Sequence, residues 1–187
     1  MKKNHLAAIA LCLLAFIILP GCATTMPSSD SPEVINTKAT IALRNLYNTN
    51  PLARSLARRA EAILIFPDVA KAGFVVGGHH GNGVLRQNGR TTGYYNTTAL
   101  SYGLQAGVQS YGFVMFLMNH HAVEHINNAG GWDVGVGPSI VVVDQGMAKT
   151  MTTATLHKDV YAFIFNQSGL MAGAGLQASK ITRVSSN

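Results

Sequence analysis

Residues 100–109 alternate between apolar or aromatic side chains and small or polar ones, and this period constrains the fold of the 187-residue chain more than any other feature. The first set is Leu100, Tyr102, Leu104, Ala106 and Val108, and the second set is Ser101, Gly103, Gln105, Gly107 and Gln109. Successive side chains of a β-strand point to opposite faces of a sheet, whereas a helix repeats about every 3.6 residues. The segment therefore predicts a strand.

Other apolar runs predict further strands along the chain. They are Ile63–Phe66, Phe74–Val76, Phe113–Met118, Ile140–Val143 and Val160–Phe165. Pro67 and Asp68 are expected to end the first run, because proline cannot donate a hydrogen bond to a sheet. The run from Phe113 is apolar throughout, which is typical of a strand covered on both faces.

Glycine-containing segments predict where the sheet turns and bends. Asn88-Gly89 separates the runs Val84–Arg86 and Thr91–Tyr95, and this dipeptide is the strongest short-range signal for a hairpin turn. Residues 170–178 alternate again, with Gly173 and Gly175 on one face. Glycines repeated on one face of a strand permit tight curvature.

Helices are predicted before and between these strands. Ser31-Pro32 is a start signal for a helix that reaches Tyr47, and Asn50-Pro51 starts a second helix that ends near Ala60. A third helix is expected over residues 120–128. Together these elements predict an α+β fold, in which short N-terminal helices pack on a strongly curved antiparallel β-sheet, barrel- or sandwich-like, in a single domain.

The N-terminus has the layout of a secretory signal. Lys2 and Lys3 precede an uncharged run from Leu6 to Leu19, and small residues follow. As a helix, those fourteen residues would span only ~21 Å, which is short of the ~30 Å hydrocarbon core of a membrane. We therefore predict a signal peptide over residues 1–21 rather than a membrane span.

The residues Leu19-Pro20-Gly21-Cys22 resemble the lipobox of bacterial lipoproteins. This resemblance implies that Cys22 receives a diacylglycerol, with palmitate-like chains, and becomes the new N-terminus. Ala23, in place of Asp, resembles the signal for sorting to the outer membrane, facing the periplasm. The alternative is an ordinary signal peptide with an incidental cysteine.

Residues 22–32 are predicted to form a flexible tether, because they are rich in Ser, Thr and Pro, and residues 33–187 are predicted to form the domain.

Positive charge is concentrated in the N-terminal half of the chain. Residues 38–90 contain eight Lys and Arg but only Glu61 and Asp68, whereas residues 91–187 contain four basic and four acidic side chains. For an exported protein near a bilayer, such a bias favours anionic lipid head groups over nucleic acid as the partner. The simpler interpretation is a solvated helix face.

Several blocks of the chain resemble the SYLF lipid-binding domain, a family found in bacterial lipoproteins and in eukaryotic membrane-associated actin regulators. In order along the chain, these blocks are residues 61–68 (EAILIFPD), 71–78 (KAGFVVGG), 81–85 (GNGVL), 101–110 (SYGLQAGVQS) and 169–176 (GLMAGAGL). The resemblance begins near Asn36. It implies non-catalytic phospholipid binding, without a cofactor, through basic and amphipathic N-terminal features.

The candidate lipid-binding residues are basic. The family resemblance points to Lys71, in the block Pro-Asp-x-x-Lys-x-Gly, whereas Arg54, Arg58 and Arg59 are inferred from their charge on the second predicted helix. An amphipathic basic helix either lies on a membrane surface or covers a protein core, and the sequence leaves both open.

The sequence gives little evidence for a catalytic or metal-binding function. The nucleophile elbow Gly-x-Ser-x-Gly and the zinc motif His-Glu-x-x-His are absent, and the acidic residues show no paired spacing. The histidines suited to a metal by their spacing are His79, His80, His120, His121 and His125, but no familiar ligand set completes a site. We therefore expect neither an enzyme nor a metal protein.

The sequence thus predicts an acyl-anchored envelope protein whose domain binds anionic phospholipid or a membrane surface. The alternative is a structural or interaction protein of the envelope, which uses its lipid only as an anchor and binds a protein or peptidoglycan partner. Neither hypothesis involves nucleic acid.

Overall fold

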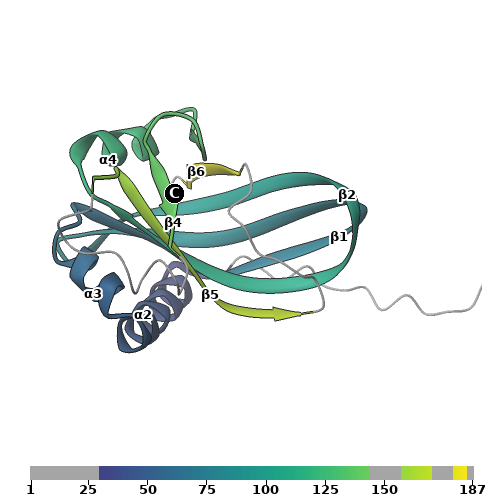
Figure 1. The fold of residues 1–187 in the computed structure, drawn as a ribbon, viewed down its shortest axis with the longest axis horizontal. Coiled ribbons are helices and arrows are strands. Elements are labelled where there is room, and N and C mark those ends of the chain that lie inside the picture. The colour runs from purple at the N-terminus through teal and green to yellow at the C-terminus, as the bar shows by residue number, and fades with distance from the viewer. Residues whose placement is uncertain (1–29, 144–156, 170–178, 185–187) are drawn as a thin grey trace, which may run out of the picture.

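A computed structural model of the chain describes residues 30–143, 157–169 and 179–184. Cys22, most of the predicted tether and the alternating residues 170–178 lie outside the described residues. Within them, helices lie against one end of a curved sheet (Figure 1). The predicted α+β class is therefore confirmed.

The two N-terminal helices begin where the sequence predicted. Helix α2 spans Pro32–Thr49, and the side chain of Ser31 caps it by accepting a hydrogen bond from the backbone N–H of Val34. Helix α3 spans Pro51–Ala57 and has Asn50 as its N-cap. It ends three residues earlier than expected, because Arg58 and Arg59 belong to a turn that leads into the sheet.

Two long strands replace several of the predicted short ones. Strand β1 spans Ala62–Gln87 and strand β2 spans Arg90–Leu117, and the two pair in an antiparallel ribbon along their whole length. The prediction that Pro67 and Asp68 end a strand is wrong. The register shifts between Phe66 and Val69, so a bulge accommodates the proline, which has no N–H to offer the ladder.

The predicted hairpin turn at Asn88-Gly89 is confirmed. Both residues have positive φ angles, 51° and 75°, which is the requirement for the two-residue turn that matches the twist of an antiparallel ribbon. Glycine adopts this conformation without strain, and asparagine tolerates it better than most residues.

The ribbon bends back on itself between its two ends. A Cβ atom on Gly73 would lie 2.6 Å from the Cα of Gly77, so the backbone turns tightly there. After the bend, the returning part of β1 packs against its own beginning. A Cβ on Gly81 would meet Val69, and one on Gly83 would lie 2.5 Å from the carbonyl oxygen of Ile65. Residues 62–72 therefore form a first pass of β1 and residues 78–87 a return pass (Figure 1).

The remaining strands extend the sheet from the other edge of β2. Residues 109–117 of β2 pair with β5 (Val160–Gly169), and residues 94–98 pair with β6 (Lys180–Val184). Strand β3 (Trp132–Asp133) pairs with β6, and β4 (Ile140–Val142) pairs with β5. The β4–β5 pair is parallel, so the sheet is mixed, and among the described strands the expectation of an antiparallel sheet is wrong for this pair. The bent ribbon and these strands form a half-barrel.

Two hydrophobic clusters lie on opposite faces of the sheet. One cluster packs between the sheet and helices α2 and α3, and the other fills the curl of the sheet beneath α4 (His120–Asn127). The predicted doubly covered strand is confirmed. Phe113, Met115 and Leu117 belong to the second cluster, whereas Val114 and Phe116 belong to the first. Among the described residues, no helix is both long and apolar enough to cross a membrane.

Candidate functional site

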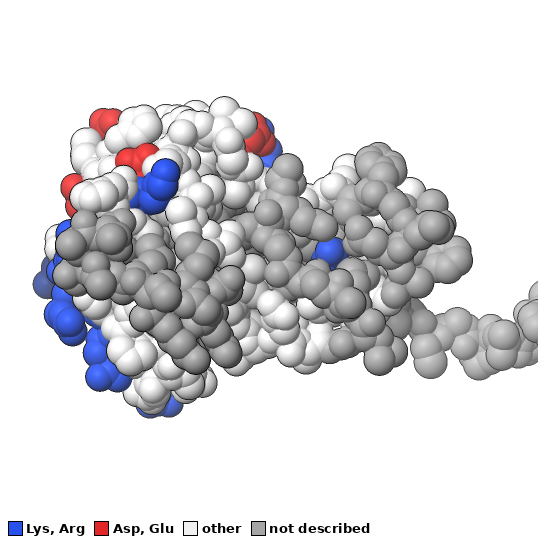
Figure 2. Space-filling model, in the orientation of Figure 1, with Lys and Arg blue, Asp and Glu red and all other residues white. Residues whose placement is uncertain are grey.

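The three predicted arginines form an exposed basic surface at the helix end of the domain. Arg54 lies on α3, Arg58 is the C-cap of that helix, and Arg59 follows it. The guanidinium of Arg54 donates a hydrogen bond of 2.8 Å to the carbonyl oxygen of Tyr47, which holds it across the junction of the two helices. Lys and Arg side chains gather on the face of the molecule over α2 and α3 (Figure 2).

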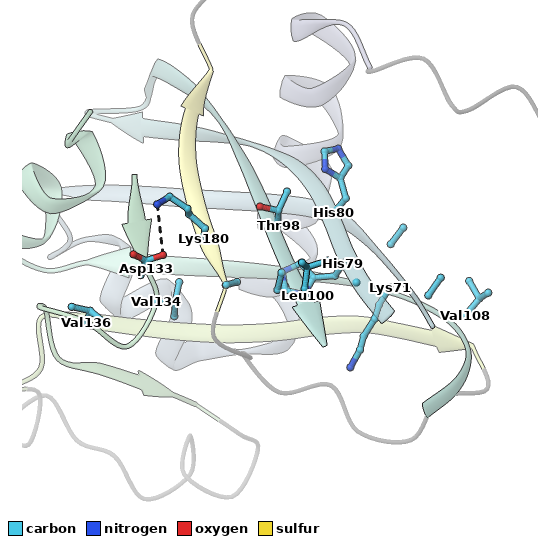
Figure 3. A pocket seen from close by; sticks show the side chains of 15 residues that line it. Lys71, His79, His80, Thr98, Leu100, Val108, Asp133, Val134, Val136 and Lys180 are labelled. Carbon is cyan, nitrogen blue, oxygen red and sulfur yellow. Dashed lines mark ion pairs between the residues drawn. The ribbon is translucent and has the colours of Figure 1, made fainter. Parts of the chain in front are cut away.

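The fourth predicted residue, Lys71, lies elsewhere, in a pocket of about 730 Å³ within the bend of the ribbon. Residues 70–72 of the first pass and residues 78–80 of the return pass line it, together with residues 98–100 of β2. One side is closed by Asp133, Val134, Val136, Ser179 and Lys180 (Figure 3). Pockets that hold small ligands commonly have volumes of ~300–1,000 Å³.

The pocket has an exposed apolar wall. Leu100 is 77% exposed, Val108 66% and Val136 64%, although all three are large apolar side chains. Leu100 and Val108 belong to the alternating segment that predicted β2, and at these positions its apolar face meets solvent. Val76, on the same bend, is also 53% exposed. Several exposed apolar residues around one concavity mark a binding surface more often than scattered single ones do.

The base of the pocket is polar and buried. Among the described residues, the buried polar or charged side chains are Lys71, His79, Thr97, Gln109 and Ser179. Lys71, His79 and Ser179 line the pocket, and Gln109 is the direct cross-strand partner of Lys71. The Oε1 atom of Gln109 is buried without a hydrogen-bond partner among the described residues. Such groups are uncommon in native interiors because each costs desolvation free energy.

His79 is held between two hydroxyl groups. Its Nε2 lies 3.5 Å from Oγ1 of Thr97, and its Nδ1 lies 3.5 Å from the hydroxyl of Tyr111, whose ring it meets edge-on. Burial lowers the pKa of His79 below its usual value of 6.5, and the positive charge of Lys71 and the neighbouring His80 lower it further. The imidazole is therefore neutral at pH 7 and leaves Lys71 as the cation at the base of the pocket.

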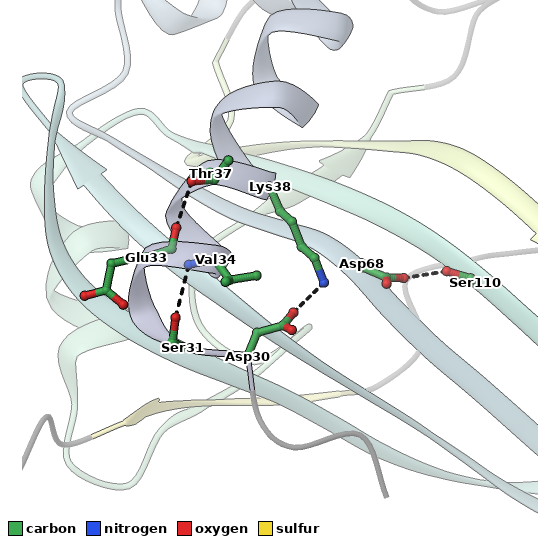
Figure 4. Close-up of polar contacts among 8 residues, drawn as sticks. All are labelled: Asp30, Ser31, Glu33, Val34, Thr37, Lys38, Asp68 and Ser110. Atoms are coloured by element: carbon green, nitrogen blue, oxygen red, sulfur yellow. Dashed lines mark hydrogen bonds and ion pairs between the residues drawn. The ribbon is translucent and has the colours of Figure 1, made fainter. Parts of the chain in front are cut away.

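Lys71 is only 4% exposed, yet no hydrogen bond or ion pair joins it to another described residue. Asp68, three residues earlier, accepts a hydrogen bond from the hydroxyl of Ser110 (Figure 4). Asp133, at the side of the pocket, pairs instead with Lys180, with 3.9 Å between Oδ1 and Nζ (Figure 3). A buried ammonium without a counter-ion is costly, and an anionic ligand would supply one.

The histidines of α4 form a separate surface group. His120 lies 3.2 Å from Glu124 and 3.8 Å from Glu61, and the rings of His121 and His125 are 5.9 Å apart. No group of three or more metal-ligating side chains in the described part of the chain could hold a metal ion. His79 and His80 line the ribbon pocket and do not join this group.

The structure thus divides the four predicted residues between two places, three arginines at the helix end and Lys71 in the pocket. Sequence reasoning considered His79 only as a possible metal ligand, and it missed Gln109 and the apolar wall. A signal for the buried pair was present, because Lys71 follows buried Val69 by two residues and Gln109 precedes buried Tyr111 by two. Residues two apart share a strand face, which places both polar side chains on an inward face.

Comparison with known proteins supports the family resemblance. Residues 98–187 match the family model Ysc84, described as Las17-binding protein actin regulator, and no curated protein matches the chain. The blocks 101–110 and 169–176 fall inside the matched region, whereas those at residues 61–85 lie outside it. This family is one of binding and regulatory domains rather than a known enzyme family. The match over residues 98–187 supports a SYLF-domain protein, with a non-catalytic binding domain.

Proposed function

We propose that this domain binds anionic phospholipid without catalysis, while acyl chains on Cys22 hold it at the membrane of the cell envelope. The observation that supports the proposal most directly is the ribbon pocket, in which an exposed apolar wall lies above the buried cation Lys71. An amphiphile that carries an apolar chain and a negative group matches both features.

The basic surface at the helix end would supply a second contact. Each Lys or Arg near an anionic membrane contributes about 1 kcal/mol, and the attraction weakens within a Debye length, which is ~8 Å at physiological salt. Arg54, Arg58 and Arg59 are exposed and close together in sequence, so they can approach phosphate groups at the same time. This contact would orient the tethered domain on the lipid surface.

Flotation with lipid vesicles tests the proposal. The chain from Ala23 to Asn187, which lacks the acyl anchor, is expected to float with phosphatidylglycerol vesicles and not with phosphatidylcholine vesicles. Charge reversal of the three arginines to Glu should reduce flotation by about tenfold or more, and 0.5 M salt should reduce it similarly. Equal and negligible binding to both kinds of vesicle would overturn the proposal.

The rival function, an envelope protein that binds a protein or peptidoglycan partner, makes a different prediction. The same chain would then retain one stoichiometric partner, and reversal of Arg54, Arg58, Arg59 and Lys71 would not change that binding. The apolar residues at the bend fit either class of ligand, but the buried lysine favours an anionic one.

A further inference from the structure

The ribbon pocket and the basic helix surface differ in how they can meet a lipid. The arginines are exposed, so they can contact only the outside of a membrane. Lys71 is buried and lines the pocket, so an anion that enters the pocket can lie beside it. Resting on the proposed phospholipid binding, we infer that the ribbon pocket takes up part of a single phospholipid, with its phosphate beside Lys71 and alkyl carbon along Leu100, Val108 and Val136.

The charged side chains around the pocket indicate where the phosphate of the lipid would bind. Two ammonium groups line the walls, but Lys180 is paired with Asp133, whose carboxylate would repel an anion at that side. Lys71 has no such partner among the described residues, and the adjacent His79 is flanked by hydroxyl groups rather than by acids. An anion is therefore best stabilised at Lys71, at the end of the pocket away from Asp133 (Figure 3).

Charge also distinguishes the candidate lipids. Lys71 is buried and has no counter-ion among the described residues, so the pocket favours a ligand with a net negative charge. Phosphatidylglycerol carries such a charge at its phosphate, whereas phosphatidylcholine has no net charge.

The volume and the exposed wall limit how much of the lipid enters. About 730 Å³ is the size of a pocket for a small ligand, so the site holds part of a lipid rather than the whole molecule. Leu100, Val108 and Val136 are exposed without a lipid, and covering them with alkyl carbon would remove apolar surface from water. A phosphate paired with a buried ammonium is also screened by salt much less than a surface contact is.

Photo-crosslinking with the mature protein, acylated on Cys22, tests this inference. The protein is reconstituted in phosphatidylcholine vesicles that contain phosphatidylglycerol with a diazirine on one acyl chain, irradiated, and digested for mass spectrometry. We expect crosslinks on peptides that contain Leu100, Val108 or Val136, and we expect them to persist in 0.5 M salt. The same diazirine on phosphatidylcholine should label these peptides about tenfold less.

Matched variants separate the pocket from the basic surface. Lys71→Met should reduce pocket crosslinking about tenfold, the effect of losing a charged hydrogen bond. Lys38→Met removes the same charge from an exposed lysine on α2 that pairs with Asp30, and it should leave crosslinking unchanged (Figure 4). Leu100→Glu alters a side chain that is 77% exposed, so it should block the alkyl chain without unfolding the domain.

Two results would overturn the inference. One is crosslinking confined to the helix end, and the other is equal pocket labelling in the Lys71→Met and Lys38→Met proteins. Either result would leave the proposed function intact if the unanchored chain still floats with anionic vesicles. Loss of flotation, by contrast, would refute phospholipid binding itself. Thermal unfolding of each variant shows whether reduced labelling comes from loss of the fold. If Lys71→Met does not fold, reduced pocket crosslinking in Leu100→Glu still tests whether an alkyl chain binds there.

Discussion

At the helix end, the β1–β2 ribbon is covered on both faces, whereas at the bend the same two strands leave large apolar side chains in solvent and bury a lysine. Val114 and Phe116 pack under α2 and α3, and Met115 between them packs beneath the sheet. At the bend, Leu100 and Val108 are mostly exposed and Lys71 is inside. The contrast indicates that the helix end stabilises the domain and that the bend is available for a ligand.

Polar groups show the same contrast. At the covered end, the carboxylate of Asp159 accepts hydrogen bonds from the backbone N–H and the hydroxyl of Ser139, both at 2.7 Å, and from the amide of Asn119 at 2.6 Å. At the bend, Gln109 Oε1 has no donor among the described residues. An unpaired buried acceptor costs desolvation free energy, and a ligand that donates a hydrogen bond to it offsets that cost.

The largest predicted effect compares apolar side chains at the two ends. Phe116→Ala removes a fully buried ring that meets Phe163 edge-on, so the free energy of unfolding should fall by about 3–5 kcal/mol. Leu100→Ala, at an exposed position, should change it by less than about 0.5 kcal/mol. Urea unfolding of both variants measures the difference, and a similar cost at both positions would refute the division of roles.

The next effect concerns the close packing of the two passes of β1. In Gly83→Ala the new Cβ would lie 2.5 Å from the carbonyl oxygen of Ile65, so the passes must separate, and we expect a loss of about 1–3 kcal/mol. Gly130→Ala is the matched control, because apart from its chain neighbours no atom lies within 4 Å of its Cβ position. Urea unfolding should place the control within about 0.5 kcal/mol of the native protein. If Gly83→Ala were equally harmless, the passes would not be in contact.

The smallest effect is a pH dependence at the covered end. Hydrogen bonds from Ser139 and Asn119 lower the pKa of Asp159 from its usual 3.8 to about 2. Because the carboxylate is favoured in the folded state, its contribution to stability is full above about pH 4 and is lost as the pH falls toward 2. Asp159→Asn should be less stable at pH 7 and less sensitive to acid over that interval, as measured by thermal unfolding at several pH values. If Asp159→Asn lost stability in acid as the native protein does, these hydrogen bonds would contribute little to the stability of the fold.

Features that depend on neighbouring residues were predictable. The cap at Ser31, the start of α3 at Pro51 and the turn at Asn88-Gly89 all formed as expected, because each depends on the φ preferences and side-chain oxygens of a few adjacent residues. The doubly covered strand was predictable for a related reason, since an unbroken apolar run has no face suited to water.

Features that depend on contacts between distant residues were not predictable. Pro67 lies inside a strand because a bulge accommodates it, and β4 lies parallel to β5, although neither fact has a local signal in the sequence. The candidate site divides in the same way. The exposure of Arg54 followed from helix periodicity, whereas Arg58 and Arg59 are exposed in the turn after α3. The burial of Lys71 required the ribbon to bend over it.

The sequence alone determined the class of the fold, the positions of its caps and hairpin, the concentration of basic residues before residue 90, and the family resemblance. Tertiary structure alone decided that Lys71 and His79 line one pocket and that Gln109 is buried across the ribbon from Lys71. These residues meet because Gly81 and Gly83 lack side chains and allow the return pass of β1 to lie against residues 65–69. That contact is long-range, and neither residue propensity nor the period of the apolar pattern encodes it.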